Sequence, residues 1–263
     1  MSKKIIFFRN DDVRESIEPE LVKLIDIFSA AEVPISLAVE PANVTQEVVD
    51  WVLEKQKCYP KVIEVIQHGY DHNKESKYPQ GTEFGTTRTF EDQYQDIQKG
   101  KQLMDTYFGK NWFQAMAFPY GSFNTPALLA LDKAEFKVLS TGVTLSFPHQ
   151  LKNWMGRLLK KDLIKGKKIS HHNCIRKPYK FVELDCSVNI IKKYHTENTA
   201  EHFSLEKIIE NVQTSSKYSS VIGILLHHRF HTDQFETIKK LVEWLKNSGQ
   251  YEFRTMKSLY SDF

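Results

Sequence analysis

The chain has 263 residues, of which 41% are hydrophobic and 12% aromatic, and its formal net charge is +3 at pH 7. This composition provides enough apolar material for a substantial core and excludes an intrinsically disordered chain. Acidic and basic residues are interleaved, which gives little support for nucleic-acid binding. The sequence contains no run of about 18 apolar residues, the length that would predict a membrane span.

The N-terminal apolar run, residues 5–8, is too short for a signal peptide and predicts a first strand instead. The cysteines Cys58, Cys174 and Cys186 are odd in number and lack the CxxC spacing of a zinc ribbon. We therefore expect reduced thiols in a cytoplasmic protein, and we make no prediction of its oligomeric state.

Short apolar runs, typical of buried parallel strands, alternate with amphipathic helical segments. The predicted strands cover residues 4–8, 34–39, 62–67, 114–118, 136–140, 181–186 and 221–226. The predicted helices cover residues 18–31, 46–54, 90–107, 126–134, 205–213 and 235–247. This alternation predicts an α/β fold of βα units around a parallel sheet or barrel, and without a linker we expect one domain over residues 1–263.

The stretch 144–179 is the least regular, and we expect it to form loops over one rim of the sheet. It contains Trp154, a candidate for stacking on a sugar ring, and a basic run between residues 160 and 168. We interpret the basic run as a solvated surface loop, with attraction for an acidic glycan as the alternative.

Polar residues follow four of the predicted strands, at the positions where parallel barrels carry their catalytic groups. They are Asp11 and Asp12 after the first strand, His68 and His72 after the third, residues 119–121 after the fourth, and His227 and His228 after the last. We therefore expect these clusters to meet at one rim.

The histidines His68 and His72 are four residues apart, a spacing that would place both imidazoles on one side of a helical turn. With Asp12 they make a set of two imidazoles and one carboxylate that suits a divalent catalytic metal. Zinc is the first choice, with iron, cobalt or nickel as alternatives. The alternative is that these residues bind no metal, and that the histidines are an ordinary surface pair and the aspartate caps a helix.

Adjacent side chains at a strand end point in different directions, so one residue of the Asp11–Asp12 pair can bind metal while the other accepts a proton. His227 directly follows a strand that we expect to be buried, and a rigidly held histidine suits a catalytic acid. His228 and His231 compete for the same assignment.

Together the clusters resemble the polysaccharide deacetylase family, also known as carbohydrate esterase family 4 or the NodB-homology domain. Residues 8–13, Phe-Arg-Asn-Asp-Asp-Val, are similar to its first motif, Thr-Phe-Asp-Asp-Gly, and residues 68–72 match His-x-x-x-His. Residues 118–121, Phe-Pro-Tyr-Gly, resemble the third motif, Arg-x-Pro-Tyr-Gly, and residues 225–227, Leu-Leu-His, resemble the fifth, Leu-x-Leu-His.

The resemblance implies a distorted, TIM-like (β/α)₇ barrel that removes N-acetyl groups from a sugar or a surface-polysaccharide precursor. It implies that Asp12, His68 and His72 hold the metal. It also implies that Asp11 is the general base, His227 the general acid, and the backbone N–H of Tyr120 an oxyanion donor. The alternatives are an amidohydrolase of this fold acting on a small non-sugar amide, and a catalytically silent glycan-binding module.

The sequence departs from the family at three places. Asn10 and Val13 replace the usual residues beside the acidic pair, Met116 and Ala117 stand where the third motif has its arginine, and the fourth motif is not found. A base beside a metal needs a group that orients it, and the guanidinium fork of Arg157 is our candidate. An ordinary surface arginine is the alternative.

Overall fold

The computed structural model describes residues 3–72, 82–85, 88–165, 167–196 and 199–263. Its main sheet contains the strands β1 (Lys4–Val13), β2 (Ile35–Val39), β3 (Ile63–His68), β4 (Ala115–Ala117), β5 (Val138–Ser140), β8 (Cys174–Ile175), β9 (Val182–Glu183), β10 (Cys186–Asn189), β13 (Val221–Leu226) and β14 (Tyr251–Phe253). They follow the order β10-β13-β1-β2-β3-β4-β5-β9-β8, and β14 pairs with β1. The pairs are parallel except for β8 with β9, and the sheet curls into a distorted (β/α)₇ barrel, as expected.

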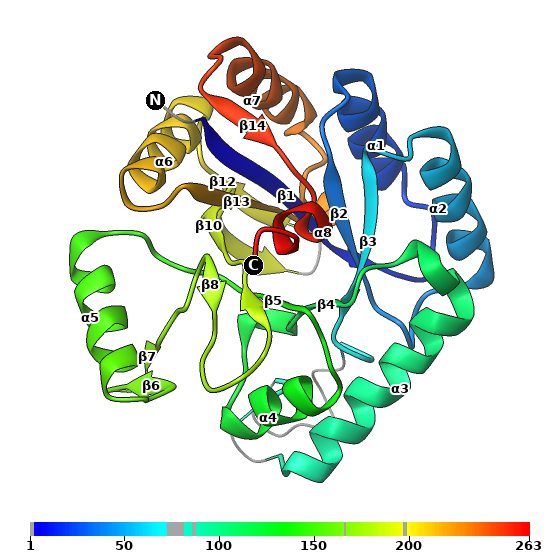
Figure 1. Cartoon of the computed structure of the whole chain (residues 1–263). Coiled ribbons are helices and arrows are strands. Elements are labelled where there is room, and N and C mark those ends of the chain that lie inside the picture. The colour runs from blue at the N-terminus through cyan, green and yellow to red at the C-terminus, as the bar shows by residue number, and fades with distance from the viewer. Residues whose placement is uncertain (1–2, 73–81, 86–87, 166, 197–198) are drawn as a thin grey trace.

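All six predicted helices are present, and they surround the curled sheet (Figure 1). They are α1 (Pro19–Ala31), α2 (Gln46–Cys58), α3 (Phe90–Phe108), α4 (Thr125–Lys133), α6 (Leu205–Tyr218) and α7 (Phe235–Asn247). Among the described residues, no helix has both the length and the apolar composition needed to cross a bilayer.

One predicted strand, residues 181–186, is divided in two by the structure. Its first part, β9, pairs with β5, and the chain then continues into β10, which pairs with β13. A further bridge between Gly142 and Cys186 joins the segment after β5 to the start of β10. This stretch of chain therefore connects the two ends of the curled sheet.

The prediction of loops across residues 144–179 is wrong in part, because this stretch contains the helix α5 (Phe147–Leu158). The short strands β6 (Leu163–Ile164) and β7 (Lys167–Lys168) follow it, and then β8. Sequence reasoning missed the helix because the side chains it buries are Asn153 and Gly156 rather than an apolar stripe.

Two layers of apolar side chains form the core. A larger cluster fills the space between the sheet and the surrounding helices, and includes Phe8 and Leu37. A smaller cluster contains Phe7 and Ala38, whose side chains alternate with those residues along the same strands, and Met256 from the short helix α8 (Met256–Tyr260). Because side chains alternate along a strand, the residues that follow Phe7 at steps of two share its side of the sheet.

Candidate active site and metal centre

The predicted clusters meet in a cleft of about 870 Å³ at the carboxyl ends of the barrel strands. Its lining includes Asp11, Asp12, His68, His72, Tyr120 and His227, which are six of the seven residues predicted for the site. It also includes residues that were not predicted for the site, among them Arg9, Arg14 and Tyr194.

The acidic pair lies within the last part of β1 rather than after it, and both side chains line the cleft. Alternation alone would turn Asp11 and Asp12 to opposite faces of the strand. The backbone of Asp12 has φ 68°, in the left-handed region, and the register with β2 shifts between Asn10 and Val13. This local irregularity brings the two carboxylates to one cavity.

The side chains of Asp12, His68 and His72 converge, with one possible ligand atom from each lying within 4.8 Å of the others. Oδ1 of Asp12 is 3.3 Å from Nε2 of His68 and 3.5 Å from Nε2 of His72. This oxygen is buried and has no hydrogen-bond partner among the described residues. A buried carboxylate oxygen facing two imidazole nitrogens fits a divalent cation well.

The outer nitrogens of both histidines have partners that fix the ring orientations. Nδ1 of His68 lies 2.9 Å from the carbonyl oxygen of Ala117, so this nitrogen donates, and Nε2, which faces Asp12, is the nitrogen that provides a lone pair once the imidazole is neutral. Nδ1 of His72 is 3.0 Å from the hydroxyl of Tyr120. Such outer hydrogen bonds are a general feature of metal-binding histidines.

The two histidines are not on a helical turn, as the spacing suggested. His68 ends β3, and the following loop has φ 59° at Gly69 and φ 52° at His72. The buried carboxylate of Glu83 lies against this loop and accepts N–H bonds from Tyr70 at 2.7 Å, and from Asp71 and His72 at 3.3 Å each. Burial and the nearby Asp71 raise the pKa of Glu83 to about 8, so the loop is held around a buried carboxyl group.

The two histidines of the cluster have very different pKa values when no cation is bound. Burial lowers the pKa of His68, but the negative charges of Asp11 and Asp12 outweigh it and raise the pKa to about 9. Burial and the neighbouring His68 lower the pKa of His72 to about 4. Burial opposes the ionisation of Asp12, yet the adjacent histidines hold its pKa well below the usual range.

Asp11 is bound by Arg9 through two hydrogen bonds, from Nε to Oδ1 at 2.8 Å and from Nη2 to Oδ2 at 2.9 Å. Arg9 also donates to the carbonyl and hydroxyl oxygens of Ser140, and both partners are buried. Burial would raise the pKa of Asp11, but the charges of Arg9, His68 and His227 hold this pKa below its usual range. Asp11 is thus kept ionised at neutral pH.

His227 follows β13 and faces Asp11, with 3.8 Å between its Nε2 and Oδ2 of the carboxylate. Its Nδ1 is 3.0 Å from the hydroxyl of Tyr194, which lies on β11 (Ile191–Thr196) of a hairpin with β12 (Thr199–His202). Burial lowers the pKa of His227, against the opposing effect of Asp12 and Asp11.

The two competing histidines have other partners. His228 is buried between Asn10 and Glu18, with 2.9 Å from its Nδ1 to Nδ2 of Asn10 and 2.7 Å from its Nε2 to Glu18. His231 accepts the backbone N–H of His227 at 3.0 Å and contacts the ring of His202. Of the three, His227 alone lines the cleft.

Tyr120 lies in a 3₁₀ turn, Pro119–Gly121, directly beyond β4, with φ 57°. This turn brings Tyr120 and Gly121 to the cleft, and the Tyr120 side chain packs on the His72 ring at 4.7 Å between centroids. The predicted rim position of Tyr120 therefore agrees with the structure.

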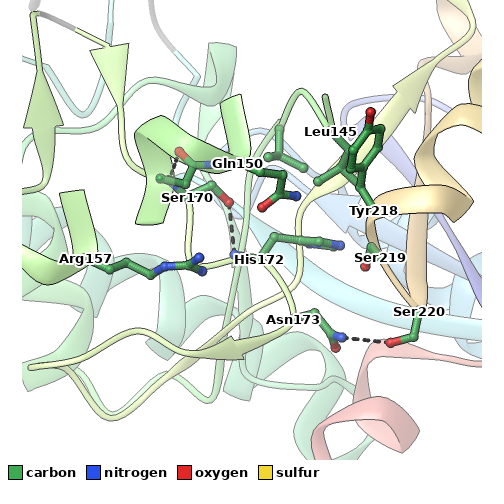
Figure 2. Close-up of a pocket in the computed structure, with 11 residues that line it drawn as sticks. Leu145, Gln150, Arg157, Ser170, His172, Asn173, Tyr218, Ser219 and Ser220 are labelled. Atoms are coloured by element: carbon green, nitrogen blue, oxygen red, sulfur yellow. Dashed lines mark hydrogen bonds between the residues drawn. The ribbon is translucent and has the colours of Figure 1, made fainter. Parts of the chain in front are cut away.

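Arg157 lies elsewhere and does not contact Asp11. It is on α5 and reaches into a second pocket of about 250 Å³, beside Ser170 and His172 (Figure 2). The arginine that holds Asp11 is Arg9, so the expected role of Arg157 is corrected. Strand alternation could have found Arg9, because it precedes Asp11 by two residues and shares its face.

Comparison with known proteins supports the family resemblance. A family model described as polysaccharide deacetylase matches residues 1–139, just over half of the chain. Curated protein sequences give no significant match.

Solved structures with the same fold cover nearly the whole chain. A Mycobacterium smegmatis protein named as a polysaccharide deacetylase has a TM-score of 0.68 and 12% identity, covering 100% of this chain and 91% of that one. A family 4 acetyl xylan esterase from Clostridium thermocellum, solved with a cobalt ion, has a TM-score of 0.59 and 12% identity, with coverages of 98% and 91%. A CE4 family pseudoenzyme from Bacillus anthracis has a TM-score of 0.60 and 13% identity, with coverages of 98% and 66%.

Proposed function

Because the chain belongs to the polysaccharide deacetylase family, hydrolases of the amide or ester bonds of acetylated sugars, we propose that it removes N-acetyl groups from a carbohydrate. One observation carries this proposal: the arginine-held carboxylate of Asp11 and the imidazole of His227 face each other 3.8 Å apart beside the Asp12, His68 and His72 cluster. A site for one divalent metal ion, an ionised carboxylate and a histidine are the groups that this kind of amide hydrolysis requires.

In this proposal Asp12, His68 and His72 hold one divalent cation, with zinc as the first choice because it accepts imidazole and carboxylate ligands without redox chemistry. Such a cation acts as a Lewis acid on the acetyl carbonyl. The buried Oδ1 of Asp12, which lacks a hydrogen-bond partner among the described residues, supports this assignment.

The proton transfers are assigned to the protein's own groups. Asp11 accepts a proton from the attacking water, and its pair with Arg9 keeps both the orientation and the ionisation needed. His227 gives a proton to the nitrogen that leaves, which an amine requires far more than an alcohol does. The backbone N–H of Tyr120 stabilises the oxyanion, a contribution of about 2.7–4 kcal/mol for one such donor.

The cleft favours a carbohydrate over a very small amide. Its volume of about 870 Å³ is near the upper end of the usual range for small-ligand sites, about 300–1,000 Å³. Aromatic side chains such as Tyr194 and Phe230 line it and provide a surface for a sugar ring. We place the substrate among cytoplasmic precursors of surface polysaccharides, as part of the same proposal.

The test is release of acetate after the metal-free protein is loaded with Zn²⁺, Co²⁺, Ni²⁺ or Fe²⁺ in turn. We expect N-acetylglucosamine oligosaccharides to be deacetylated by the wild type, and His68→Ala to lose both metal and activity. His149→Ala is the matched control, because His149 lies on α5 and is bonded to Ser146.

Two outcomes would replace the proposal. Acetate release from small amides alone would favour the non-sugar amidohydrolase. Metal and glycan binding with no release from any N-acetylated substrate would favour the silent binding module, a possibility made concrete by the pseudoenzyme of the same fold.

A further inference from the structure

Helix α5 exposes its apolar side chains, and the residues that it buries are Asn153 and Gly156. Phe147, Trp154 and Leu158 are 70%, 56% and 68% exposed, and Leu151 and Met155 are also exposed. At about 100° per residue, these five side chains occupy one stripe about 100° wide along the helix. A globular helix normally turns such a stripe to the core.

The opposite face of α5 attaches the helix to the barrel through small and polar groups. Asn153 is buried and accepts the backbone N–H of Ser170 at 3.2 Å. A Cβ at Gly156 would collide with Ile169, so this glycine allows the helix to approach closely. These contacts fix the orientation of α5 on the barrel, so its apolar stripe faces outward as part of the fold.

The surroundings of α5 are basic. Residues 147–168 carry seven basic side chains and one acidic side chain, a net charge of +6, whereas the whole chain carries +3. The remaining residues therefore have a net charge of −3. The single acidic side chain, Asp162, is bound by Arg176 at 2.9 Å, and Lys160, Lys161, Lys165 and Lys167 are exposed.

We propose that α5 is an interfacial helix that lies on the surface of a bilayer containing anionic phospholipids. An exposed apolar stripe that includes a tryptophan and has lysines beside it matches the requirements of such a helix: acyl-chain contact on one face and headgroup attraction beside it. With 12 residues, α5 lies on a membrane and does not cross it.

The combination of the two features separates this partner from others. A nucleic acid would use the lysines but would leave the apolar stripe in water. A second copy of the chain would cover the stripe but would bring two basic segments, each of net charge +6, together. Of these three partners, anionic lipid satisfies both. Gly142, four residues before the N-cap residue Ser146, lines the catalytic cleft, so docking by α5 would hold the cleft near the bilayer.

Co-sedimentation with vesicles tests the proposal directly. The probes are vesicles of phosphatidylcholine alone and vesicles with roughly one third phosphatidylglycerol. We expect binding to the anionic vesicles only, and weaker binding in high salt because the lysine contribution is screened. Leu151→Glu should weaken this binding by about tenfold or more, since it places a charge in the apolar stripe.

The chain offers a close control for this variant. Leu129 on α4 is 48% exposed and Leu151 is 49% exposed, so Leu129→Glu makes the same change on another helix and should leave vesicle binding intact. The pair Lys160→Ser and Lys161→Ser should lower binding, whereas the exposed pair Lys239→Ser and Lys240→Ser on α7 should not.

Fluorescence gives a second measurement that depends on the geometry of the stripe. Trp154 is the only exposed tryptophan of the four, so vesicles should shift the emission to shorter wavelength in the wild type but not in Trp154→Phe. Equal binding of Leu151→Glu and Leu129→Glu, or no binding of folded protein to anionic vesicles, would overturn the proposal. So would a dimer in solution that Leu151→Glu dissociates.

The membrane proposal stands apart from the proposed function. Leu151→Glu should release acetate from soluble oligosaccharides at the wild-type rate, because α5 contributes no residue to the catalytic cleft. Conversely, His68→Ala should bind vesicles as the wild type does. Failure of one proposal therefore leaves the other measurable.

Discussion

Both carboxylate oxygens of Asp11 are held by the guanidinium of Arg9, which precedes it by two residues on β1. Since residues two apart face the same side of a strand, β1 alone provides the carboxylate and the cation that orients it. The arginine missing from the segment before Pro119 is thus replaced from within the first strand.

Arg9→Lys should lower kcat/KM by about 10–100-fold, because an ammonium group cannot hold two oxygens and small misplacements of a catalytic group are costly. Metal content should not change. Arg9 lowers the pKa of Asp11, so weaker pairing raises that pKa and moves the acidic limb of the rate profile to higher pH. Arg157→Lys is the control, and a loss of rate there with an unaffected Arg9→Lys would contradict our assignment.

Substitutions of the adjacent residues Asp11 and Asp12 should have different effects on metal content and on activity. Asp11→Asn should keep one metal ion per chain and lose activity by about 10²–10⁴, the usual effect of removing a general base. Asp12→Ala should lose the metal, since its Oδ1 faces both histidines. If Asp11→Asn lost the metal while Asp12→Asn kept metal and activity, the two roles would be reversed.

Metal affinity should rise with pH because His68 must lose a proton to bind. The pKa of His68 is raised to about 9 in the metal-free cluster, so the proton is present at pH 7 and absent above the pKa. The apparent affinity should increase about tenfold per pH unit up to about pH 9 and then level. Calorimetry at pH 7 in buffers of different ionisation enthalpy should detect one proton released, and a result of zero would count against this proton assignment.

Two neighbouring histidines should give opposite phenotypes. His227→Ala should lose most of the activity while the free energy of unfolding changes by less than about 1 kcal/mol. His228→Ala should lower that free energy by about 1–3 kcal/mol, because the buried groups of Asn10 and Glu18 lose their partner. Urea titrations and acetate release on both variants test this contrast, and equal stabilities would refute it.

Glu83→Ala should weaken metal binding by about 10–100-fold, although Glu83 is not among the three proposed ligands. The substitution removes the carboxylate that accepts the N–H groups of Tyr70, Asp71 and His72. Glu91→Ala, at an exposed position in the first turn of α3, is the control. Unchanged metal affinity in Glu83→Ala would mean that the loop keeps its shape without the buried carboxyl group.

The barrel could be predicted from sequence because its strands are continuous apolar runs, such as Ile222 to Leu226. Such runs are typical of parallel strands that are buried on both faces of the sheet. The positions of Asp12, His68, His72 and His227 at the strand ends followed from the same pattern. Asp11 and Asp12 share one cavity because of the left-handed backbone at Asp12, which no periodicity reports.

Other features depend on tertiary contacts that a linear pattern does not contain. Tyr194 reaches His227 from a hairpin strand whose residues 192–195 are all exposed, so its sequence resembles that of a surface segment. Glu83 is buried because the backbone of residues 70–72, 11 to 13 positions earlier in the chain, folds around it. Helix α5 has the correct periodicity, but its apolar face is turned away from the core, so neither its role nor that of Arg157 could be read from the pattern.

The place of β1 in the sheet has a consequence for folding. Every proposed metal ligand lies within the first 72 residues, but β1 is held on one side by β13 and along its first residues by β14, strands formed from residues 221–253. These contacts join segments more than 200 residues apart, and such long-range pairings form late. The catalytic strand is therefore synthesised more than 200 residues before the strands that enclose it, and a chain shortened before residue 221 would keep all its proposed metal ligands without the neighbours that hold them in place.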